Sequence, residues 1–109
     1  LCGMKSGRNL DKFSACRLTE RPASQVGAPL LAESPLSLEC KVTQVLELGT
    51  HHMFLAEIVA VDADEALFNT EGRLCLEKAG LLAYAHGAYY PLGKALGLFG
   101  FSTKKKKKK

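Results

Sequence analysis

The stretch Leu36-Ser-Leu-Glu-Cys-Lys-Val-Thr-Gln-Val-Leu-Glu-Leu48 alternates between apolar and polar residues over most of its length. A period of two residues is typical of a β-strand that buries one face. We therefore expect one apolar face and one polar face. The apolar set is Leu36, Leu38, Cys40, Val42, Leu46 and Leu48, and the polar set is Ser37, Glu39, Lys41, Thr43 and Glu47.

A second strand is predicted directly after this one. Gly49-Thr50 forms a turn signal, and the run from His52 to Val61 is apolar at positions of both parities. Such a run indicates a strand covered on both faces. We predict that residues 36–48 and 52–62 pair as an antiparallel hairpin.

The flanking sequence predicts short elements and irregular connections. Residues 1–9 form a Gly-rich loop, and Asn9 is the expected N-cap of a helix over residues 10–18. Residues 19–35 carry three of the four prolines and are read as an irregular segment. Beyond the hairpin we expect one helical turn at 65–68, a loop at 69–72, a strand at 81–84, and an apolar run at 88–101 broken by Pro and Gly. The expected class is mainly β with short helices (α+β).

The positive net charge of +4 comes from one segment, because six of the fifteen basic residues are Lys104–Lys109. Without them nine basic residues stand against eleven acidic ones, so we expect no nucleic-acid partner. Like charges in a block repel one another and stay solvated. We therefore divide the chain into a folded part, residues 1–103, and a disordered lysine tail, residues 104–109.

The four cysteines show no close pair, since their spacings are 14, 24 and 35 residues. Zinc and redox dithiol motifs have much closer pairs. We expect reduced thiols and a cytoplasmic protein, with Cys40 and Cys75 as small core residues. Adjacent strand residues point to opposite faces, so His51 and His52 are not expected to share a metal, and we predict no metal site.

The opening stretch Cys2-Gly-Met-Lys-Ser-Gly-Arg-Asn-Leu-Asp-Lys-Phe13 combines a hydroxyl, flexible backbone and three cations. Those groups together suit a phosphate. The stretch resembles the Cys-Gly-x-x-Ser-Gly-Arg-x-x-Asp-Lys-Phe signature of the flavin reductase-like, FMN-binding split-barrel proteins. Further segments resemble that family in the same order: 23–25 with 28–33, 36–42, 49–61, 87–93 and 99–102. Thr50 stands where that family usually has Asp.

The resemblance implies that residues 1–103 are the C-terminal part of a split β-barrel that lacks its N-terminal half. It implies an oxidoreductase that binds FMN and takes electrons from NADH or NADPH, commonly as a homodimer whose C-terminal run packs on the partner. Ser6, Gly7 and Lys12 are then the phosphate-binding candidates, with Arg8 as the alternative cation. Tyr89 is the candidate for stacking on the flavin, and His51 for acting near the flavin and nicotinamide rings.

Other readings remain open on the residues alone. The same fold serves an FMN-binding electron carrier without nicotinamide activity, and a truncated chain is equally consistent with an inactive fragment. Ser6, Gly7 and Lys12 also suit a helix cap with a surface lysine, His51 an exposed turn residue, and Tyr89 core or interface packing. The apolar run 88–101 followed by six lysines suits a membrane surface. Since that run lacks helical amphipathicity, we expect no membrane partner.

Overall fold

The computed structural model describes residues 4–103. The predicted lysine tail and Cys2 lie outside the described residues. The chain divides into two compact units, Leu1–Cys75 and Leu76–Lys109.

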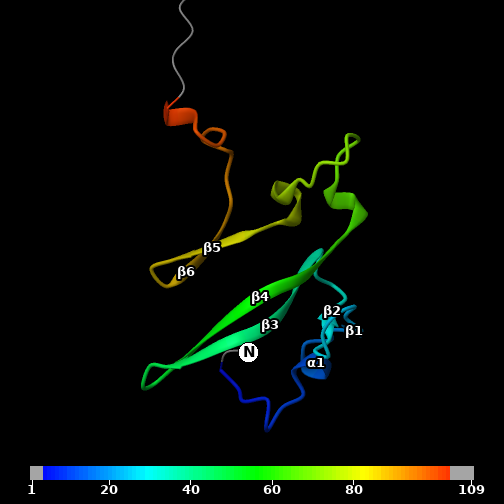
Figure 1. Ribbon diagram of the computed structural model, residues 1–109, viewed down its shortest axis with the longest axis vertical. Helices are drawn as coiled ribbons and strands as arrows, with labels where there is room; N and C mark the ends of the chain where they lie inside the picture. The colour runs from blue at the N-terminus through cyan, green and yellow to red at the C-terminus, as the bar shows by residue number, and fades with distance from the viewer. Residues whose placement is uncertain (1–3, 104–109) are drawn as a thin grey trace, which may run out of the picture. The chain divides into compact units, whose positions relative to one another are not determined.

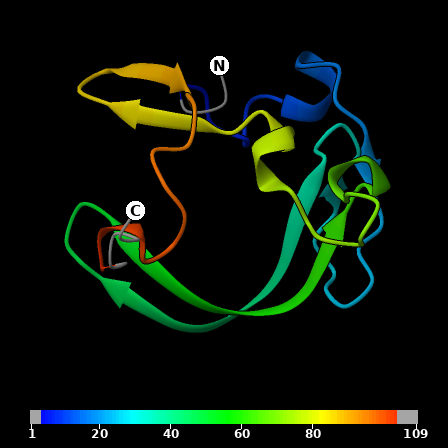
Figure 2. The same ribbon diagram turned by 90° about the horizontal axis from the view of Figure 1, so that it is seen from above.

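A long antiparallel hairpin dominates the first unit (Figure 1). Strand β3 runs over Leu36–Glu47 and β4 over His52–Ala63, which confirms the predicted pairing and its bounds to within a residue. Gly49 has a φ of +87°, a conformation that side chains with a Cβ rarely adopt, so glycine suits this turn. The strands curve together along their length (Figure 2).

Two register shifts interrupt the ladder, one between Glu39 and Cys40 and one between Val42 and Gln44. A bulge adds a residue to one strand and so changes which residues share a face. Beyond the second shift, Val45 pairs with Phe54 and joins the face of Val42. Leu46 therefore lies on the opposite face, and its predicted place beside Leu36–Val42 is wrong.

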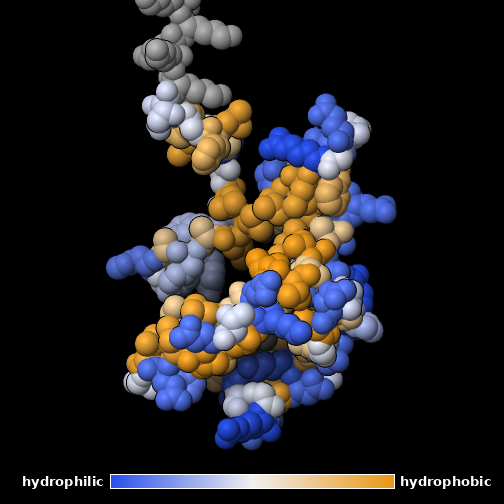
Figure 3. All heavy atoms as spheres, viewed as in Figure 1, coloured by the Kyte–Doolittle hydropathy of each residue, from blue (hydrophilic) through white to orange (hydrophobic). Residues whose placement is uncertain are grey.

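Burial on the hairpin also differs from the prediction. The apolar face, defined here by its large exposed residues, has exposed fractions of 46–61% at Leu38, Val42, Val45, Phe54, Ile58 and Val61. Cys40, expected in the core, is exposed on the same face. The second strand is not covered on both faces. Apolar side chains accordingly lie at the surface over the hairpin (Figure 3). Alternation defines two faces, but burial depends on what packs against them.

The polar face carries the buried residue instead. Glu39 is 1% exposed. The segment around Ser24 and Gln25 covers it, because both residues donate hydrogen bonds to its carboxylate. This segment contains the short antiparallel pair β1 (Glu20–Arg21) and β2 (Leu30–Leu31), which the reading of 19–35 as irregular did not anticipate.

The first helix is shorter than predicted and is capped by a different residue. Helix α1 spans Lys12–Ala15, and its N-cap is Asp11 rather than Asn9. The Asn9 amide is used in a turn, where it donates to the Ser6 carbonyl. Arg17 takes a left-handed φ of 57°, which ends the helical path.

The first unit ends in a compact loop. The predicted helical turn is present as η1 (Glu65–Leu67). Phe68 then bridges to Leu74, and the Cys75 amide donates to the Leu67 carbonyl. Leu67 and Cys75 are 3% and 5% exposed, so they form a small buried centre, and Cys75 is a core thiol as expected.

The second unit is built on a hairpin of β5 (Leu82–Ala85) and β6 (Ala88–Pro91), preceded by η2 (Leu76–Ala79) and followed by η3 (Phe101–Thr103). The first strand lies one residue from its predicted position, whereas β6 was read as a broken apolar run. His86 and Gly87 both have positive φ, as a two-residue type I′ turn requires. Within residues 4–103 no helix is long and apolar enough to cross a membrane.

Candidate functional site

The opening loop is held as a tight turn by its own polar groups. The Asn9 amide donates to the Ser6 carbonyl at 3.2 Å, and the Arg8 amide donates to the Ser6 hydroxyl oxygen at 3.2 Å. A Cβ added at Gly7 would meet no atom within 4 Å, so the backbone there is open to an approaching ligand. Ser6 therefore shapes this loop by engaging the Arg8 and Asn9 amides, whereas Gly7 itself presents open backbone.

An open concavity borders this turn. It is lined by residues 7–13 together with Glu20, so it includes Gly7, Arg8 and Lys12. Lys12 is the first residue of α1 and is half-buried. The structure thus places Gly7 and Lys12 on the same concavity, and Ser6 directly precedes its lining residues without being one of them. Two cations, a hydroxyl and exposed backbone form a donor set that fits a phosphate.

Asp11 is the acidic neighbour within this segment, and its carboxylate is already engaged. Oδ2 accepts from the Ser14 hydroxyl at 2.9 Å and Oδ1 accepts from the Ser14 amide at 3.3 Å. These hydrogen bonds from Ser14 lower the pKa of Asp11. The carboxylate therefore fixes the start of α1, so the Ser14 amide is occupied by the chain's own cap.

His51 lies at the tip of the β3–β4 hairpin, just before His52 begins β4. Its Nδ1 is 2.9 Å from the Thr50 hydroxyl oxygen, and its carbonyl accepts from the Leu48 amide. The ring is exposed, and Nε2 remains for another partner. His51 is not among the residues that line the opening-loop concavity. The structure therefore orients this imidazole without placing it in that concavity.

Tyr89 belongs to the second unit, on β6. It pairs across the strands with Tyr84, and the two rings meet edge to face with centroids 5.1 Å apart. Both are largely exposed, Tyr84 by 64% and Tyr89 by 73%. An exposed aromatic pair of this kind offers a stacking surface.

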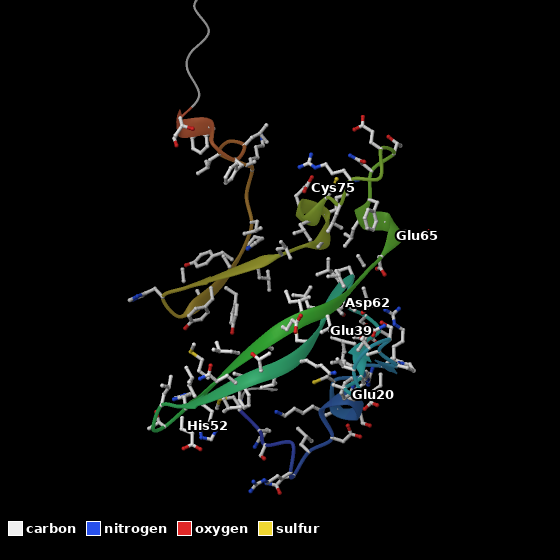
Figure 4. The ribbon with its side chains drawn as sticks, viewed as in Figure 1. Glu20, Glu39, His52, Asp62, Glu65 and Cys75 are labelled. Atoms are coloured by element: carbon white, nitrogen blue, oxygen red, sulfur yellow. The ribbon has the colours of Figure 1, made fainter. Side chains whose placement is uncertain are left out.

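Glu39 is a further polar residue with a specific role, and sequence alternation did not distinguish it from the other residues of the polar face. The Gln25 amide donates to Oε1 at 2.6 Å, while the Ser24 amide and hydroxyl donate to Oε2 at 3.1 and 3.0 Å. Asp62 lies beside it on β4 (Figure 4). Alternation placed Glu39 on the polar face, and nothing in the pattern showed that a loop would cover it.

Residues 1–93 match the model of the flavin reductase like domain. The chain is 33% identical over 81 residues to the FMN reductase (NADH) RutF of Pantoea ananatis, which covers 74% of this chain and 35% of the relative.

Solved structures give the same result. The flavoredoxin of Desulfovibrio vulgaris (Miyazaki F) aligns with a TM-score of 0.81 and 31% identity, over 93% of this chain and 55% of that one. A putative flavin reductase with a split barrel domain from Shewanella frigidimarina aligns with a TM-score of 0.69 and 26% identity, over 86% and 49%. The chain thus spans about a third to about half of these proteins' lengths. Since the family model matches most of the chain, the chain belongs to the flavin reductase like domain family.

Proposed function

We propose that this chain serves an FMN-dependent oxidoreductase that receives electrons from a reduced nicotinamide nucleotide, NADH or NADPH. The observation that carries the proposal is the family match over residues 1–93, together with a relative named as an FMN reductase that uses NADH. Bound flavin supplies the redox chemistry in such a protein. The residues of this chain contribute binding, orientation and hydrogen bonding.

The opening loop is the proposed phosphate-binding element. Gly7 presents open backbone, Ser6 fixes the turn, and Lys12 lines the adjoining concavity. Of the two cations there, Lys12 is the proposed primary contact and Arg8 the secondary one. Lys12 extends from a capped helix start, whereas Arg8 sits in the turn itself.

His51 and Tyr89 take the proposed roles nearer the rings. The Thr50 contact at Nδ1 orients the imidazole of His51. Its Nε2 is then directed to donate or accept one hydrogen bond at a substrate atom. Tyr89 is proposed to pack against a flat ring, for which its exposed edge-to-face pair with Tyr84 is a suitable surface.

A homodimer is proposed as the working form. Six large apolar side chains on one face of the hairpin are 46–61% exposed, and a contiguous apolar surface of this kind is typical of an interaction site. A second copy of the chain is the proposed occupant. The cytoplasm is the proposed compartment, supported by the wide spacing of the four cysteines, which include no close pair.

An FMN-binding electron carrier is the second candidate. His51 lies at the hairpin tip and is not among the residues that line the opening-loop concavity. The described lining of this concavity contains no histidine to assist hydride transfer, which favours a chain whose bound flavin exchanges electrons without a nicotinamide.

One experiment with two readouts separates these functions. The purified chain is titrated with FMN by fluorescence quenching and is then assayed for FMN-dependent NADH oxidation at 340 nm. Binding with NADH oxidation supports the reductase. Binding without oxidation supports the carrier, and absence of both contradicts flavin function for this chain. A parallel assay with NADPH identifies the donor.

A further inference from the structure

Glu39 is the least exposed charged residue among residues 4–103, at 1%. Three donors from the segment Ser24-Gln25 point at its two oxygens, at 2.6–3.1 Å. A buried carboxylate is stable only when such hydrogen bonds replace water. Glu39 therefore fastens the 22–29 loop to the hairpin, a role that neither flavin binding nor hydride transfer uses.

Asp62 lies beside Glu39, on the neighbouring strand and the same face. Its Oδ2 is buried, and it has no hydrogen-bond donor among the described residues. Two ionised carboxylates in contact repel each other, and neither can donate. If Asp62 carries a proton, however, its hydroxyl donates to Glu39, and the orphaned oxygen is satisfied.

We propose that Glu39 and Asp62 share one proton, and that this proton completes a clamp that holds the Ser24-Gln25 loop against the β3–β4 hairpin. In this arrangement Glu39 is the ionised acceptor of four hydrogen bonds, and Asp62 is the fourth donor. Loss of the shared proton leaves two adjacent negative charges under the loop and loosens it.

Of the charges around the pair, one opposes the proton on Asp62, and its effect is smaller than those that favour it. Arg21 on β1 is the cation that acts on Asp62, and it lowers the aspartate's pKa in opposition to Glu39. Glu20 on β1 is exposed. Lys41 and Glu57 follow on the same face and pair with each other across the strands, so their charges offset. Residues 22–29 contain no ionisable side chain.

The pKa directions give the pH window. The hydrogen bond from Asp62, with those from Gln25 and Ser24, lowers the pKa of Glu39 to about 2, so its contribution is lost as pH falls toward 2. The hydrogen bond to Glu39, followed by burial, raises the pKa of Asp62 above 3.8. Its contribution is lost as pH rises through that raised value. The clamp is therefore strongest above the Glu39 pKa of about 2 and below the raised pKa of Asp62, and it weakens at higher pH.

The substitution Asp62→Asn tests the clamp, because the amide of asparagine donates to Glu39 at every pH. Above the raised pKa of Asp62 we expect it to raise the Tm by about 4 °C, the shift that one hydrogen bond gives in a domain of this size, and below that pKa we expect a smaller change. Asp64→Asn is the matched control. It removes the same charge two residues away, at an exposed side chain without a cap hydrogen bond, and should leave the pH profile unchanged.

Two further readouts test the proton directly in the unmodified chain. With ¹³C-labelled carboxyl groups, Asp62 should titrate above its ordinary value and Glu39 near 2. Above the raised pKa of Asp62 the Ser24 and Gln25 amides should exchange more slowly in Asp62→Asn than in the unmodified chain. An Asp62 that titrates at its ordinary value, or an Asp62→Asn variant that behaves like Asp64→Asn, overturns the proposal.

Discussion

The segment from Met4 to Pro35 and the β3–β4 hairpin are held together in opposite ways. The segment has four-residue and two-residue elements only, and side-chain oxygens fasten it by accepting from backbone amides. Ser6, Asp11, Glu33 and Glu39 each hold one or more amides in this way. The hairpin instead has two twelve-residue strands joined by a backbone ladder with two register shifts, and its apolar face stays open.

The two regions depend on different features of the sequence: the hairpin on a pattern that extends over many residues, and the segment on single polar residues. Alternation specifies a strand and its faces over many residues, so no single side chain decides the hairpin. The segment that carries Ser6, Gly7 and Lys12 depends on individual polar groups, each in one position. Substitution of one acceptor should therefore disturb the segment, whereas substitution on the open face should change association rather than folding.

The largest stability effect is expected at Glu39. Glutamine retains one acceptor oxygen and turns an N–H group toward the Ser24 or Gln25 amide, so Glu39→Gln should lower the Tm by about 8 °C or more. Glu57→Gln removes the same charge from an exposed site on the same face and should change the Tm by no more than about 2 °C. Thermal denaturation followed by circular dichroism measures both. Equal shifts would show that the carboxylate of Glu39 does not hold the loop.

The next effect concerns the open face. Val45 and Gln44 are neighbours on β3 but lie on opposite faces. A charge placed at the centre of an apolar interface should weaken association at least about tenfold, so Val45→Asp should dissociate the proposed homodimer. Gln44→Asp should leave it intact. Sedimentation velocity over a concentration series compares them, and an unmodified chain that stays monomeric throughout would remove the dimer proposal.

As the pH falls, the segment from Met4 to Pro35 should lose its structure before the β3–β4 hairpin does. Hydrogen bonds from Thr19 lower the pKa of Glu33, those from Ser14 lower that of Asp11, and Glu39 has a pKa of about 2. Depressed carboxylates stabilise the fold above their unfolded values and lose that contribution as pH falls through the folded ones. Between pH 4.5 and 2, amide protection should therefore be lost in residues 4–35 first. Amide protection that is lost at the same pH along the whole chain would contradict this order.

The smallest effect is expected on FMN affinity when His51 is replaced. His51 does not line the concavity beside Ser6, Gly7 and Lys12, so His51→Ala should change the FMN dissociation constant by less than about twofold. The rate of NADH oxidation, if present, should fall more than the affinity does. A large loss of FMN affinity would place the hairpin tip inside the phosphate site.

The sequence predicted the elements whose signals extend over many residues. Alternation and Gly49 located the hairpin. Gly7 and Lys12 line one concavity, whereas the phosphate role predicted for Ser6, Gly7 and Lys12 stays a prediction. The bulges were missed because an extra residue has no compositional signal, and so Leu46 was put on the wrong face. Asn9 and Asp11 are both good N-caps, and the choice rests on Ser14, which supplies a hydroxyl and an amide three residues after Asp11. Strand β6 was not predicted because Pro91 was read as a break in the apolar run. In the structure Pro91 is the last residue of the strand, where proline is tolerated.

Burial could not be predicted because it depends on contacts between distant segments. Glu39 looks like any polar residue of an alternating strand until Ser24 and Gln25, some fifteen positions earlier, cover it. The apolar face has the residue types of a buried core, but in the structure its large side chains are exposed.

The central claim is that the opening segment binds the flavin phosphate through Lys12. NMR titration of the chain with FMN, and with riboflavin as the ligand that lacks the phosphate, tests it most directly. FMN should shift the amide signals of Ser6, Gly7 and Lys12, and riboflavin should not. Lys12→Ala should weaken FMN binding about ten- to a hundredfold, since a charge-assisted contact contributes roughly 1.5–3 kcal/mol, and Arg8→Ala should weaken it less. Identical shifts with both ligands, or FMN affinity unchanged in Lys12→Ala, would contradict the claim and leave this segment as a helix cap.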